Sequence, residues 1–147
     1  GEAGSQSHTQ TPLLYRLSRT DLEAAEAAAD IKIKPRDTVL LYMAHHDRTF
    51  GTPAFLTDFP GLVKESAEWL GRKEIVMFGV EAVSPGRPGK HNFEVHLVCR
   101  DMQFTHMEGL ANLDKLIGKG RFRFIGFPLK IRGGTGSPIR PVAVLEE

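Results

Sequence analysis

Two apolar runs decide the fold: Thr38-Val-Leu-Leu-Tyr-Met43 and Glu74-Ile-Val-Met-Phe-Gly-Val80. The first run is too continuously apolar for a half-exposed strand, so a buried central strand is expected there, and the second is expected to be another buried strand. Between them, Pro60 opens a helical pattern that ends at Gly71. A strand, a helix and a second strand in this order predict a parallel crossover and therefore an α/β fold.

Further elements are expected on both sides of this unit. Thr20 followed by Glu23 fits a capping box, and the alanine-rich segment behind it predicts a helix from Thr20 to Ala29. A polar loop is expected from His45 to Pro53. The downstream patterns predict a short helix over 91–100, strands over 104–108 and 121–125, and a last buried strand over 142–145.

Composition narrows the class of protein. The chain has 147 residues, 41% of them hydrophobic and 25% charged, which indicates one globular domain. Residues 1–10 are small and polar and are expected to be a tag-like or disordered terminus, which leaves 11–147 as the domain. The single cysteine excludes an intramolecular disulfide and favours a cytoplasmic setting.

Charge and hydropathy argue against two kinds of partner. A net charge of +1 is too balanced for a protein that binds nucleic acid mainly through its phosphates. No apolar run approaches the roughly 18 residues of a membrane span. A small-molecule substrate remains the expected partner.

Two glycine-rich loops do not fit nucleotide-binding motifs. A Walker loop has a glycine five residues before its Gly-Lys pair, and in this chain Ser84 stands five residues before Gly89-Lys90. The Gly134-Thr-Gly136 segment lacks its third glycine, because Ile139 occupies that place. The second loop is either a tight turn or the border of a pocket, and the two alternatives stay open.

Histidines supply the better candidates for chemistry. His45, His46, His91, His96 and His106 fall near loops or strand ends, where side chains can converge. None of the usual close metal-binding spacings is present, however. By local spacing alone, each histidine is more often a surface or hydrogen-bonded core residue than a metal ligand.

A series of motifs nevertheless resembles a known family. In order, they include Lys34-Pro-Arg-Asp-Thr-Val-Leu-Leu, Phe59-Pro-Gly-Leu, His96-x11-Glu108 and Phe127-Pro-Leu-Lys-Ile-Arg-Gly-Gly-Thr-Gly-Ser-Pro-Ile-Arg140. This pattern resembles the cyclase family of metal-dependent hydrolases, whose members include kynurenine formamidases and isatin hydrolases. The resemblance implies a swivelling β/α domain with a mixed sheet and flanking helices. It also implies zinc- or manganese-dependent hydrolysis of an aromatic amide, cyclic amide or ester.

The resemblance also implies site residues. His96 and Glu108 occupy the positions of metal ligands, and imidazole with carboxylate suits either metal. The loop from Gly133 to Arg140 is expected to border the substrate, with Thr135, Ser137 and Arg140 as its binding residues. The His45-His46-Asp47-Arg48 segment resembles the branch that opens cyclic amides and esters. His45 and His46 are therefore candidate catalytic residues, and the alternative is an ordinary polar loop.

One departure from the family pattern limits these expectations. The family's early His-x-Gly-Thr-His-x-Asp motif does not occur in the chain, which is therefore expected to be the C-terminal portion of such an enzyme. His96 and Glu108 alone should bind metal weakly, and His45, His46, Asp47 and His106 are the first places to look for further ligands. A metal-free binding or structural module is the alternative function. Uncovered sheet edges are expected to make the chain a homo-oligomer.

Overall fold

The computed structural model describes residues 11–145, so the tag-like terminus expected at 1–10 lies outside the described residues. The main sheet has three parallel strands in the order β2 (Thr38–Leu41), β4 (Met77–Val80) and β5 (Thr105–Met107). Thr38 pairs with Met77, and Met77 pairs with Thr105. The predicted parallel crossover from the first apolar run to the second is confirmed.

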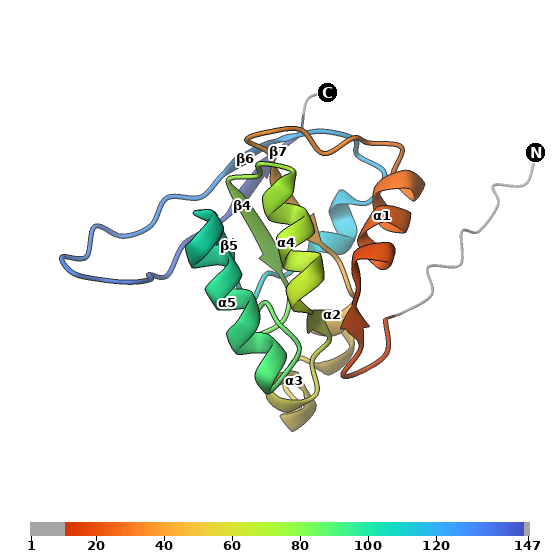
Figure 1. Ribbon diagram of the computed structural model, residues 1–147, viewed down its shortest axis with the longest axis vertical. Helices are drawn as coiled ribbons and strands as arrows, with labels where there is room; N and C mark the ends of the chain where they lie inside the picture. Colours follow the sequence, from red (N-terminus) through yellow and green to blue (C-terminus); the bar gives the residue numbers. More distant parts are fainter. Residues whose placement is uncertain (1–10, 146–147) are drawn as a thin grey trace, which may run out of the picture.

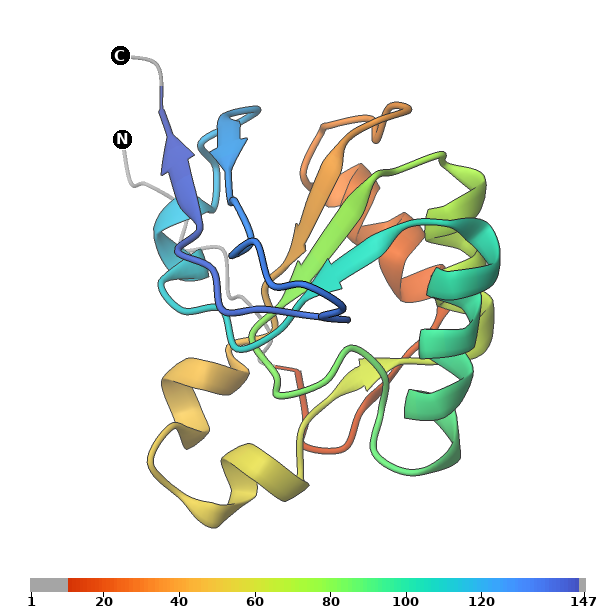
Figure 2. The same ribbon diagram turned by 90° about the vertical axis from the view of Figure 1, so that its left-hand side faces the viewer.

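Helices cover one face of this sheet, as Figures 1 and 2 show. They are α1 (Arg19–Ala28), α4 (Lys64–Arg72) and α5 (Lys90–Met102). Phe78 and Val80 point from β4 into the core that these helices close. A second, smaller core lies on the other face, where Met107 contacts Leu110 and Leu113.

Shorter elements complete the fold. The 3-10 helix η1 (Leu113–Leu116) and a two-stranded antiparallel ribbon of β6 (Arg123–Ile125) and β7 (Val142–Val144) lie over the smaller core (Figure 2). β1 (Arg16–Leu17) pairs in parallel with β3 (Gly61–Leu62). α2 (His45–Thr49) and α3 (Pro53–Thr57) form a small lobe after β2. Within residues 11–145, no helix combines the length and the apolar character that crossing a membrane requires.

The first helix is confirmed to within one residue at each end, but its expected capping residue is wrong. Ser18, rather than Thr20, caps α1: its hydroxyl accepts a hydrogen bond from the backbone N–H of Asp21 at 3.3 Å. The Asp21 carboxylate in return accepts from the Ser18 N–H at 2.7 Å. The capping box is therefore displaced by two residues, because Ser-x-x-Asp and Thr-x-x-Glu overlap in the sequence and both satisfy the pattern.

Three other local expectations are also wrong. The 45–53 segment is largely helical, with α2 in it, instead of a polar loop. The second helix begins at Lys64, because Gly61 and Leu62 pair with β1 before it. The last strand, β7, is largely exposed, since it pairs with β6 in the ribbon and not with the main sheet.

The order of strands in the main sheet also differs from the expectation. β4, and not β2, is the central strand. β2 is half-buried at all four positions because it forms an edge of the sheet.

Candidate metal centre

The carboxyl ends of the three parallel strands meet at one edge of the sheet. His45 follows β2, Glu81 and Ser84 follow β4, and Glu108 follows β5. In open parallel sheets, ligands bind in the crevice outside this edge. The edge is therefore where a functional site is expected, and polar side chains from all three strand ends gather there.

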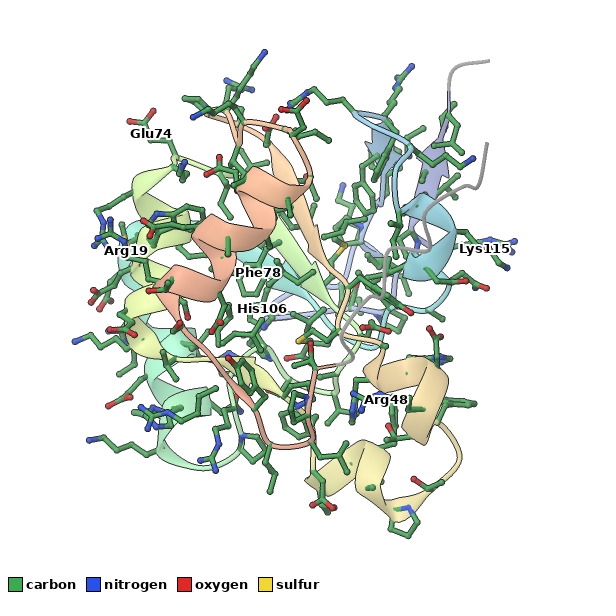
Figure 3. All side chains as sticks on the ribbon, turned by 90° about the vertical axis from the view of Figure 1, so that its right-hand side faces the viewer. Arg19, Arg48, Glu74, Phe78, His106 and Lys115 are labelled. Atoms are coloured by element: carbon green, nitrogen blue, oxygen red, sulfur yellow. The ribbon has the colours of Figure 1, made fainter. Side chains whose placement is uncertain are left out.

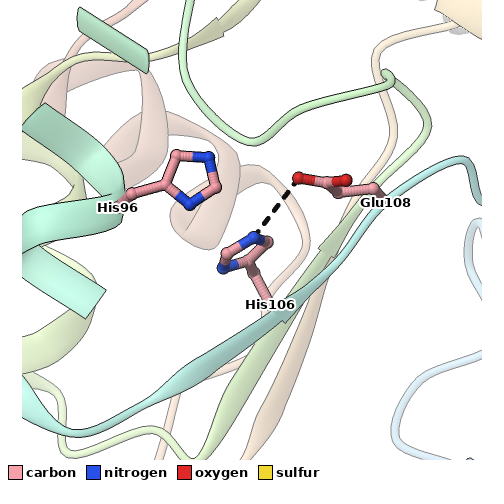
Figure 4. A group of neighbouring side chains, drawn as sticks. All are labelled: His96, His106 and Glu108. Carbon is pink, nitrogen blue, oxygen red and sulfur yellow. Dashed lines mark ion pairs between the residues drawn. The ribbon is translucent and has the colours of Figure 1, made fainter. Parts of the chain in front are cut away.

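Three potential metal ligands come together beside this edge. His106 and Glu108 are two residues apart on an extended segment, so their side chains project to the same face of the sheet, which α5 covers. His96 reaches them from α5 (Figure 4). The potential ligand atoms of His96, His106 and Glu108 all lie within 4.8 Å of one another. His106 Nε2 is 3.3 Å from Glu108 Oε1, and the two imidazole rings meet edge to face with centroids 4.8 Å apart.

Packing holds this cluster in place. Met107, between His106 and Glu108, points to the opposite face and is buried in the smaller core. Val95, next to His96 on α5, is completely buried in the larger core. The ring of Phe78 on β4 is centred 5.8 Å from that of His106, and Figure 3 shows the two side by side. Both backbones that carry the cluster are therefore fixed by buried neighbours.

His96 is held in the form that binds metals. Burial lowers its pKa below the ordinary value, and the neighbouring His106 lowers it further, while Glu108 opposes the shift. At neutral pH the imidazole is therefore neutral, with one nitrogen lone pair free to bind a metal.

The cluster fits a transition metal in both chemistry and size. Two imidazoles and one carboxylate suit zinc and also manganese. Ligand atoms that each lie about 2.0–2.2 Å from one zinc ion are at most about 4.4 Å apart. The observed span of 4.8 Å is only slightly wider. Small side-chain rotations would therefore bring the three groups around one ion.

Glu81 is a polar residue at the same edge that the sequence reasoning did not single out. It is 1% exposed, and its carboxylate accepts hydrogen bonds from the backbone N–H groups of Met43 at 2.5 Å and His45 at 3.4 Å. Ala44 between them has a left-handed backbone, with φ of 53°. Glu81 therefore holds the turn that leads from β2 into α2.

The buried charge on Glu81 predicts a pH dependence of stability. Burial raises the pKa of Glu81, although the hydrogen bonds from Met43 and His45 oppose this, so the folded chain binds the proton more tightly than the unfolded chain does. The free energy of unfolding should therefore fall as the pH rises above the unfolded pKa of about 4.5, relative to Glu81→Gln, which keeps a carbonyl acceptor but no charge. Urea unfolding of both proteins from pH 4 to 8 measures this difference, and parallel curves over that range would contradict it.

The two candidate catalytic histidines lie in different environments. His45 is completely buried, stacks on Phe55 with ring centroids 5.4 Å apart, and donates from Nε2 to the Phe55 carbonyl at 3.1 Å. Burial lowers its pKa as well. His46 is partly exposed and stacks on Phe50, with centroids 4.5 Å apart. Of the two, His46 is the one that a substrate could reach.

The candidate substrate-binding residues lie on the loop that joins β6 to β7. We call residues 126–141 the arm, and Figure 1 shows it projecting from the body of the molecule. Thr135 and Arg140 are exposed, and Ser137 accepts a hydrogen bond from the Leu129 N–H at 2.9 Å. The loop is mostly irregular, with a turn at Arg132 and Gly133, and a Cβ added at Gly136 would meet nothing within 4 Å.

The sequence alone predicts only part of the cluster. His96 and Glu108 were the expected ligands, and the structure brings them together. His106 was expected only as one of several possible further ligands. The predicted strand over 104–108 contained the missing signal, because strand alternation places His106 on the same face as Glu108.

Comparisons with known proteins agree with this architecture. The family model named Cyclase matches residues 5–87, more than half of the chain. The chain belongs to the cyclase family. An isatin hydrolase from Roseibium aggregatum is 42% identical over 91 residues, which are 58% of this chain and 34% of that protein.

Solved structures extend the likeness beyond residue 87 to most of the chain. The crystal structure of an isatin hydrolase bound to the product analogue thioisatinate has a TM-score of 0.79 at 30% identity, and the match covers 90% of this chain and 54% of that one. The crystal structure of a novel cyclase has a TM-score of 0.78 at 27% identity, covering 90% of this chain and 47% of that one. The chain thus spans about a third of the sequence relative and about half of these two structures.

Proposed function

We propose that the chain contributes to a metal-dependent hydrolase that cleaves an amide or ester bond in a small aromatic substrate. The observation that carries this proposal is the cluster of His96, His106 and Glu108 at the carboxyl edge of the sheet, in a chain of the cyclase family. An isatin-type ring opening is favoured over the hydrolysis of aryl formamides, because the similarity to isatin hydrolases supports it.

Different residues of the chain would bind the metal and line the substrate pocket. His96, His106 and Glu108 would hold zinc or manganese. When bound, such an ion lowers the pKa of a coordinated water towards 7 and polarises a carbonyl group. We assign the pocket role to His46 and not to His45, because only the His46 ring is partly exposed.

The arm would supply the substrate-binding groups Thr135, Ser137 and Arg140. Hydrolysis of a cyclic amide produces a carboxylate, and a guanidinium such as that of Arg140 can bind a carboxylate through two parallel hydrogen bonds. The exposure of Arg140 in the structure supports this role, since its side chain is available to a ligand.

Metal content tests the proposal against a metal-free module that keeps the fold alone. The purified chain is dialysed with Zn²⁺ or Mn²⁺, freed of excess ion and subjected to elemental analysis. The proposal expects about one ion per chain, released by a chelator, and slow metal-dependent ring opening of isatin. Absence of stoichiometric metal under both conditions would favour the module and contradict the hydrolase.

We also propose that the chain forms a homo-oligomer through the arm. Phe127, Leu129 and Ile131 alternate along it and are 80%, 61% and 52% exposed. Exposed apolar side chains on an extended segment favour pairing with another chain. A second copy is the expected partner.

Sedimentation at micromolar concentration tests this association. A dimer or larger species is expected for the unaltered chain, and a shift towards monomer for the double variant Phe127→Ser, Ile131→Ser. Phe93→Ser is the control, because Phe93 is 67% exposed but lies on α5. A monomeric unaltered chain would contradict the proposal.

A further inference from the structure

Ser84 contacts two members of the metal cluster at once. Its hydroxyl Oγ lies 3.4 Å from His96 Nε2 and 3.4 Å from Glu108 Oε1. Both distances are at the long end of hydrogen bonding, so each contact is weak by itself. Together the two contacts connect His96 on α5 to Glu108 at the end of β5 through one hydroxyl group.

The surrounding loop fixes Ser84 in this position. Pro85, the next residue, is buried, and its carbonyl accepts a hydrogen bond from the Leu62 N–H at 3.0 Å. The Gly86 N–H donates to the Asn92 side chain on α5 at 3.1 Å. The loop after β4 is thus tied to β3 on one side and to α5 on the other. The Ser84 side chain therefore projects from a backbone with little freedom to move.

The hydrogen-bonding capacity of the three groups determines where the protons lie. An ionised carboxylate can only accept, so the single O–H of Ser84 is donated to Glu108. The remaining contact, between Ser84 Oγ and His96, then requires the Nε2–H of His96 to donate to Oγ. In the metal-free chain this places the proton of the neutral imidazole on Nε2 and the lone pair on Nδ1.

We infer that Ser84 is a positioning residue for the metal ligands, which fixes the tautomer of His96 and orients the carboxylate of Glu108. This inference rests on the proposed function for its role in metal binding, while the tautomer is a property of the chain without metal. Hydrogen bonds from outer partners orient metal ligands, and losing one typically weakens metal binding by about 10- to 100-fold.

Two measurements on three variants test the inference. The variants are Ser84→Ala, which removes the hydroxyl, Ser84→Thr, which retains it, and Thr105→Ala, a control at the exposed first residue of β5. Nitrogen-15 NMR of the histidine rings reports the tautomer of His96 in the metal-free proteins. Calorimetric titration with Zn²⁺ alone reports the affinity of the cluster.

The expected result is a mostly Nε2-protonated His96 in the unaltered chain, in Ser84→Thr and in Thr105→Ala. In Ser84→Ala the tautomers should be mixed and the zinc affinity about tenfold lower. The inference is overturned if Ser84→Ala leaves the tautomer of His96 unchanged, or if it binds zinc as tightly as, or more tightly than, the unaltered chain. If the unaltered chain binds no zinc but Ser84→Ala still alters the tautomer, the proposed function fails and the positioning of His96 stands.

Discussion

Replacement of His106 by alanine is expected to reduce the zinc affinity of the chain by about a hundredfold or more. Losing a residue that only hydrogen-bonds to a metal ligand typically weakens binding by about 10- to 100-fold, and losing a ligand itself should cost at least the upper value. The variant removes one of the three ligands that cluster within residues 11–145 and leaves His96 and Glu108 as a pair. Two protein ligands do not complete even the three-ligand arrangement of catalytic zinc sites. Zinc titration by calorimetry measures the change, and Glu108→Gln should behave similarly.

A matched control separates metal binding from general damage. His91→Ala removes an imidazole from α5, the helix that carries His96, where His91 Nδ1 is 3.3 Å from Glu94 Oε2, and should leave the zinc affinity unchanged. Melting temperatures on the same samples give the second readout. If His106 were a purely structural residue, its loss would cost on the order of 1–3 kcal/mol of stability with no effect on zinc, and that outcome would contradict its role as a ligand.

Gly61→Ala is expected to destabilise the chain by about 3 kcal/mol or more, beyond the usual cost of overpacking. A Cβ at this position would lie 2.3 Å from the backbone nitrogen of Arg87 and 2.3 Å from the backbone carbon of Gly86. Both are backbone atoms, so no side-chain rotation relieves the overlap. β3 would have to move away from the loop that carries Ser84.

Denaturant unfolding measures this effect, with Gly136→Ala as the control. A Cβ added at Gly136 would meet nothing within 4 Å, and the residue needs no left-handed backbone, so alanine there should change the unfolding midpoint little. Equal midpoints for the two variants would show that the approach between Gly61 and the loop is not tight in solution.

The sequence predicted the parts of the fold that depend on local pattern. The apolar runs at 38–43 and 74–80, with a helix between them, were enough to predict parallel pairing, and the pairing of β2 with β4 confirms it. The order of the strands in the sheet could not be predicted from the local pattern. β4 becomes central because β5 pairs with its other side, and that contact joins segments about 30 residues apart whose pattern does not encode adjacency.

In the candidate site, too, some residues could be predicted from the sequence and others could not. The spacing of His96 and Glu108 was visible through the family resemblance, whereas the proximity of His106 to His96 arises when α5 folds back over β5. Glu81 was missed because a glutamate in a sequence indicates exposure far more often than burial. Its burial depends on two backbone N–H groups that a distant turn presents to it.

The position of β5 at the border of the sheet has a consequence for local dynamics. A border strand has a neighbour on one side only, so its amide hydrogens exchange with solvent through smaller opening motions than those of a central strand. His106 and Glu108 lie on and just after this strand, while His96 lies on the helix that precedes it. An ion shared by the three residues would join β5 to α5, because His96 lies on the helix and His106 on the strand that follows it. Binding of the ion would thereby make the opening motions of β5 less frequent, and its release would make them more frequent.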